Sequence, residues 1–98
     1  MVVEVKLSKP VPSEGTEIST LQIREPIGED IAACGYPFRI YLSSDTDVDA
    51  KKEQEAKIDT VVLTKLAAKL ANVPPSTIKR LPVKDYQKVV DAVMGFFE

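Results

Sequence analysis

The chain has 98 residues, of which 44% are hydrophobic and 29% charged, and its formal net charge is -2. This length allows one small domain with a core, and the composition argues against a disordered chain. The charge gives no basis for non-specific nucleic-acid binding, and no apolar run approaches the roughly 20 residues that span a bilayer.

The chain contains one cysteine, Cys34, and no histidine. A single cysteine cannot form an internal disulfide, and without histidine there is no imidazole metal ligand and no Cys–His nucleophile pair. We therefore predict a protein without catalytic activity or cofactor, with Cys34 as a small apolar side chain in or near the core. Because Glu4 and Lys6 interrupt any signal-type segment, we expect the protein to stay in the cytosol.

One acidic run, Asp45-x-Asp47-x-Asp49, resembles the first half of a calcium-binding loop. The sixth position of that loop holds Ala50 where a sharp turn needs glycine, and the twelfth holds Ala56 where calcium needs a bidentate carboxylate. We interpret the run as a solvated acidic loop and predict no metal site.

Charge is unevenly distributed along the sequence. Residues 1–49 carry 4 basic and 9 acidic groups, whereas residues 50–98 carry 9 basic and 6 acidic groups. Both sets are typical of outer faces that keep a protein in solution; the alternative is a bipolar surface that orients a partner.

The N-terminal part predicts an antiparallel hairpin. Apolar and polar residues alternate over 3–7 and again over 21–24, as in strands with one face in water. Between them, residues 8–16 contain two prolines and a glycine, which exclude a regular ladder there and predict an ordered loop.

Residues 26–42 predict a short helix followed by a third strand. Pro26 ends the second strand, residues 28–30 form an acidic first helical turn, and Gly35 and Pro37 stop the helix. Residues 38–42 are apolar and aromatic, which favours a strand. The polar segment 43–57 is interpreted as a mobile connection.

The C-terminal part predicts helices. Apolar residues recur at three- and four-residue steps from Ile58, with Asp59 as the N-cap, until Pro74-Pro75 forbids continuation. Residues 75–81 suit one helical turn. A final amphipathic helix follows Pro82, with Asp85 in its first turn, where the helix dipole favours a carboxylate.

These elements predict a single α+β domain over residues 1–98. A small antiparallel sheet, formed by the hairpin and the third strand, occupies the β-rich part at 1–42. The helical part at 58–97 packs on it, and 43–57 connects the two.

The apolar stripe of the final helix ends in two aromatic residues and carries no reactive group, which indicates an interaction surface. Consecutive helical residues point about 100° apart, so Phe96, Phe97 or Met94 is expected to be exposed. Our hypothesis for the partner-binding residues comprises one set from the final helix and two leucines from the preceding one: Val89, Val93, Met94, Phe96, Phe97, Leu63 and Leu70.

Several short motifs follow one another along the chain: Leu7-x-x-Pro10, Gly15-x-x-Ile18-x-x-Leu21-x-Ile23-Arg24-x-Pro26, Asp30, Leu66-Ala67, Asn72-Val73-Pro74, Ile78-x-x-Leu81-x-x-x-Asp85-Tyr86 and Val93-x-x-Phe96-Phe97. In this order they resemble the small tail assembly chaperones of temperate, contractile-tailed phages and Mu-like prophages. Residues 34–57 match no motif of that family.

The resemblance implies a non-catalytic chaperone in the host bacterial cytoplasm. Its expected partners are the long helical tape measure protein and, further, tail tube subunits, with homo-oligomerisation left open. Some members also exist in a longer form made by ribosomal frameshifting. The alternatives are a structural tail component, in the tube or baseplate, and a generic protein-binding module.

Overall fold

The first hairpin is the largest element of the computed structural model, which describes residues 1–41 and 55–98. Strand β1 (Val2–Ser13) pairs antiparallel with β2 (Thr16–Arg24). The predicted hairpin is confirmed, but β1 continues through the proline-containing segment. The register with β2 breaks between Lys6 and Val11, which accommodates Pro10. Pairing resumes from Val11 to Ser13, with Pro12 opposite Glu17, so the connecting turn is only two residues long.

The turn between β1 and β2 is formed by Glu14 and Gly15. Both have positive φ angles, 50° and 86°, which suits the right-handed twist of a two-residue hairpin. Gly15 adopts this geometry without a Cβ penalty, whereas Glu14 does so against its preference.

Helix α1 (Gly28–Cys34) follows β2, as predicted, and Gly35 ends it at φ 92°. Cys34 is half-buried and packs against the core, in agreement with its predicted role. The third strand, β3 (Phe38–Tyr41), is confirmed, but it pairs with an unpredicted strand, β4 (Glu55–Ile58), in a separate two-stranded sheet. Of the predicted connection 43–57, residues 55–57 lie in β4 and residues 43–54 lie outside the described residues.

Three helices complete the fold: α2 (Thr60–Ala71), α3 (Pro75–Lys79) and α4 (Val83–Gly95). The predicted N-cap of α2 is confirmed, because the Asp59 side chain accepts a hydrogen bond from the Val62 N–H at 3.2 Å. Asn72 ends α2 in the left-handed conformation. Pro82 stands immediately before α4 as its N-cap residue.

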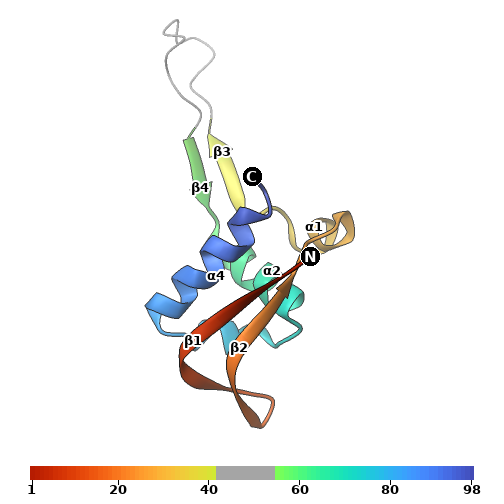
Figure 1. The fold of residues 1–98 in the computed structure, drawn as a ribbon. Helices are drawn as coiled ribbons and strands as arrows, with labels where there is room; N and C mark the ends of the chain where they lie inside the picture. The colour runs from red at the N-terminus through yellow and green to blue at the C-terminus, as the bar shows by residue number, and fades with distance from the viewer. Residues whose placement is uncertain (42–54) are drawn as a thin grey trace, which may run out of the picture.

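The core lies between the first hairpin and the helices. Figure 1 shows β1 and β2 running across α2 and α4, with the β3–β4 hairpin extending from the other end of the helices. The inward residues of both strands meet apolar residues of the helices, and the buried cluster comprises Val5, Val11, Leu21, Ile23, Leu66, Ala67, Ala68, Leu70, Ile78, Leu81, Val89 and Val93.

A buried carboxylate, Asp30, holds the end of β2 to α1 and α2. It accepts hydrogen bonds from both terminal nitrogens of Arg24, at 2.7 and 2.9 Å, and from the Ile27 N–H at 2.9 Å. Lys69 of α2 places its Nζ 3.7 Å from the same carboxylate. The Arg24 and Ile27 hydrogen bonds hold the pKa of Asp30 well below its usual range, despite burial.

We predict that Asp30 makes the fold acid-sensitive. Because its pKa is lower in the folded than in the unfolded chain, its contribution is complete above about pH 4 and is lost as the pH falls further. Asp30→Asn should therefore lower the free energy of unfolding by about 2 kcal/mol at pH 7, and by less at pH 3. Urea unfolding at both pH values measures this. Equal losses at both would contradict the assignment, and exposed Asp91→Asn is the control.

Candidate functional site

The structure divides the seven predicted partner-binding residues into two groups. Four belong to the interior, with exposed fractions of 0–2%: Leu63, Leu70, Val89 and Val93. Their helical spacing correctly predicts an apolar helix face. In a chain of this size, however, that face packs into the core. Side chains buried in this way cannot contact a partner while the chain stays folded. The remaining candidates for the partner-binding surface are Met94, Phe96 and Phe97, which are half-buried.

The two aromatic residues at the end of α4, Phe96 and Phe97, contact different parts of the structure. Beyond Gly95 the chain continues as a tight turn, in which the Phe96 N–H donates to the Val93 carbonyl and the Phe97 N–H to the Met94 carbonyl. Phe96 and Phe97 both pack against the core, each leaving part of its ring exposed.

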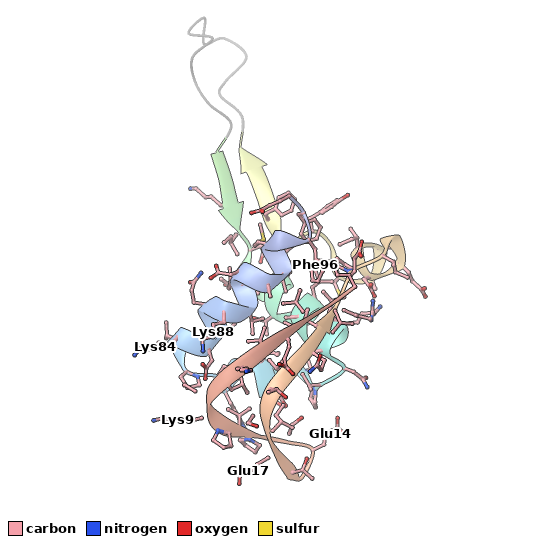
Figure 2. All side chains as sticks on the ribbon, viewed as in Figure 1. Lys9, Glu14, Glu17, Lys84, Lys88 and Phe96 are labelled. Atoms are coloured by element: carbon pink, nitrogen blue, oxygen red, sulfur yellow. The ribbon has the colours of Figure 1, made fainter. Side chains whose placement is uncertain are left out.

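Phe96 lines a hollow of about 370 Å³, here called the terminal hollow. Figure 2 shows Phe96 where the end of α4 approaches the beginning of β1. Met1, 86% exposed, stands at its edge, and two carboxylates, Glu25 and Asp91, also line it. The terminal hollow therefore suits an apolar side chain with basic neighbours. The described residues that line it are Met1, Val3, Glu25, Asp91, Ala92, Gly95 and Phe96.

Phe97 joins an aromatic cluster with Tyr36 and Phe38. Its ring centroid lies 5.4 Å from that of Phe38 and 6.1 Å from that of Tyr36, in edge-to-face arrangements, and the latter two rings are 5.5 Å apart. Tyr36 is 58% exposed and thus extends the apolar surface beyond α4. No pattern in the sequence predicts this contact, because Tyr36 lies in the link between α1 and β3, remote from the final helix.

The position of α4 is fixed by Asp85, which is completely buried. Its carboxylate accepts hydrogen bonds from the main-chain N–H of Ser8 at 3.0 and 3.1 Å and from the Ser8 hydroxyl at 3.0 Å. Ser8 lies in the irregular part of β1, where the strand leaves N–H groups unpaired by β2. The predicted position of Asp85 in the first turn of α4 is confirmed, and the side chain also joins α4 to β1.

Lys88, one turn further along α4, strengthens the same junction. Its Nζ donates to the Lys6 carbonyl at 3.0 Å and lies 3.7 Å from the Asp85 carboxylate; Figure 2 shows Lys84 and Lys88 along one side of the helix. Burial alone would raise the pKa of Asp85, but the Ser8 hydrogen bonds and the Lys88 charge outweigh it, so the pKa is lowered.

We predict a graded response to substitutions at this junction. Asp85→Asn removes the charge and leaves an amide NH₂ facing a main-chain donor, so the thermal unfolding midpoint should fall by several degrees. Ser8→Ala removes the hydroxyl but keeps the N–H bond, and should have a smaller effect. Circular dichroism melts compare the two variants, and an equal loss would show that the main-chain bond contributes nothing.

Other chemistries find little support in the described part of the chain. Residues 1–41 and 55–98 contain no group of three or more side chains arranged to hold a metal ion. The acidic run Asp45–Asp49 lies outside the described residues. No helix in the described ranges is sufficiently long and apolar to cross a membrane.

The fold is that of a small α+β domain with partly exposed apolar side chains at the end of α4. Comparison with protein families gives a match over residues 4–98 to the family described as phage tail assembly chaperone proteins, E, or 41 or 14. The match includes nearly the whole sequence, so the chain belongs to this family and has a role in phage tail assembly. No curated protein and no solved structure matches it.

Proposed function

We propose that this protein is a non-catalytic chaperone that binds the tape measure protein of a phage or prophage in the host bacterial cytoplasm. By covering apolar stripes of that long helical client, it keeps the client soluble until tail tube subunits assemble around it. The observation that supports this most strongly is the family match over residues 4–98.

The surface at the end of α4 is suited to this task. A helical client exposes apolar side chains along one face, and these gain free energy when a partner removes them from water. Met94, Phe96 and Tyr36 supply partly exposed apolar area, and the terminal hollow can receive a side chain. Glu25 and Asp91 attract clients that carry lysine or arginine beside the apolar stripe.

A structural tail component is the alternative within phage assembly. Such a protein remains in finished virions, whereas a chaperone leaves before the particle is complete. Mass spectrometry of purified particles therefore separates the two functions, and the chain's abundant presence in virions would contradict the proposal. A generic binding module would fail to retain the tape measure protein in a pull-down.

The structure changes what we expect of substitutions at the two phenylalanines. On sequence grounds, Phe96→Ser with Phe97→Ser should abolish client binding and leave thermal unfolding nearly unchanged. Both rings pack against the core, and Phe97 also contacts Phe38 and Tyr36, so the double variant should lose stability as well. Single substitutions of more exposed residues give a cleaner test.

We predict that Tyr36→Ser and Met94→Ser each reduce the amount of tape measure protein that stays soluble when the two proteins are co-expressed. Because both side chains are partly exposed, the free energy of unfolding should fall by only about 1 kcal/mol. Buried Leu63→Ala is the control, since it should cost about 3 kcal/mol yet keep client binding below its melting temperature. The surface is wrongly assigned if Leu63→Ala loses binding while the other two variants retain it.

A further inference from the structure

A second apolar groove lies where three helices meet, away from the residues that the sequence suggested. It has a volume of about 580 Å³ and is here called the helix-junction groove. Helix α2 supplies most of its wall, α3 the opposite side and α4 one aromatic ring. The lining residues are Thr60, Val61, Thr64, Lys65, Pro75, Lys79 and Tyr86.

Two hydroxyl groups that line the groove, those of Thr64 and Tyr86, are already engaged in hydrogen bonds. The Tyr86 hydroxyl lies 2.8 Å from the Thr64 hydroxyl and donates to the Thr60 carbonyl at 3.3 Å. The Thr64 hydroxyl bonds to the same carbonyl at 2.7 Å. The hydroxyls of Thr64 and Tyr86 are thus engaged with each other and with α2, which leaves mainly apolar contact area for an occupant.

The rim of the groove is basic. Lys65 and Lys79 stand on different helices, and neither forms an ion pair within the described part of the chain. By contrast, Lys69 and Lys88 lie beside the buried carboxylates Asp30 and Asp85. Among the described residues, none that lines the groove is acidic, and Val61 is 64% exposed beside the two lysines. An occupant with apolar side chains and flanking carboxylates would complement this rim in charge.

We propose that the helix-junction groove binds an amphipathic helical segment of a partner protein whose apolar ridge is flanked by aspartate or glutamate. A helix fits better than an extended strand, because the groove walls are helices and provide no open main-chain edge for strand pairing. The groove then differs from the terminal hollow, which is flanked by carboxylates, in the charge of the segment that it accepts.

This assignment adds a second binding surface to the proposed function. It rests on the proposed function only for the identity of the client. A tape measure protein that used both surfaces would present basic residues to the terminal hollow and acidic residues to the helix-junction groove. A second copy of the chain is the competing occupant, because exposed Ile27 stands between Glu25 and Glu29 and carries similar chemistry.

The test uses two designed helical peptides of roughly five turns, which share one leucine and alanine ridge. Glutamate flanks the ridge in the first peptide and lysine in the second. Titrated into the ¹⁵N-labelled protein, the glutamate peptide should shift the amides of Val61, Lys65, Lys79 and Tyr86. Its dissociation constant should be at least about tenfold below that of the lysine peptide, and the difference should shrink with added salt.

Charge reversal on the protein provides the matched control. Lys65→Glu and Lys79→Glu should each weaken binding of the glutamate peptide by roughly threefold to tenfold. Lys9→Glu changes the net charge by the same amount near the hairpin turn, where Figure 2 places Lys9 with Glu14 and Glu17, and should leave binding unchanged. A uniform loss in all three variants would indicate a non-specific charge effect and overturn the proposal.

The remaining outcomes also decide the matter. Equal binding of both peptides, shifts confined to Met94 and Phe96, or no binding at millimolar peptide would each overturn the proposal. Sedimentation of the protein alone tests the second copy: self-association abolished by Ile27→Lys, and by Lys79→Glu, would assign the groove to that copy. If the glutamate peptide binds but the tape measure protein does not, the proposed function fails while the chemistry of the groove stands.

Discussion

The arrangement of this protein depends on one buried carboxylate that receives a main-chain N–H from the opposite end of the sequence. Asp85 accepts from Ser8 across a separation of 77 residues and thereby sets where α4 lies against β1. The hydrogen bonds from the main-chain N–H and the hydroxyl of Ser8, together with the charge of Lys88, compensate for removing Asp85 from water. Both candidate surfaces include side chains of α4, so their geometry follows from this contact.

Much of the fold follows from local patterns in the sequence. Three such patterns each act over a few residues: the alternation around Val5 and Ile23, the Asp59 cap, and the prolines that follow α2. They therefore predict the hairpin and the helices correctly. The pairing of β3 is different. A four-residue strand contains nothing that selects its partner, and β4 lies in a polar stretch whose composition favours a loop or a helix.

The candidate surface was harder to predict, for a related reason. Spacing along α4 identifies an apolar face, but the same face can meet the core or a client. Only the packed structure shows that Val89 and Val93 are enclosed while Phe96 remains at the edge. The helix-junction groove is harder still to predict from the sequence. Its walls come from three helices, and Tyr86 is held in it by hydrogen bonds to residues of α2.

The bond from Lys88 to the Lys6 carbonyl has a consequence for the order in which a newly made chain can fold. The first hairpin has a short turn and local contacts, so it can form early during synthesis. The main-chain groups of β1 that Asp85 and Lys88 bond to then remain exposed until the ribosome has released residues 85–88. An uncovered strand edge invites pairing with other chains. Docking of α4 therefore also ends a period in which the nascent protein is itself prone to aggregate.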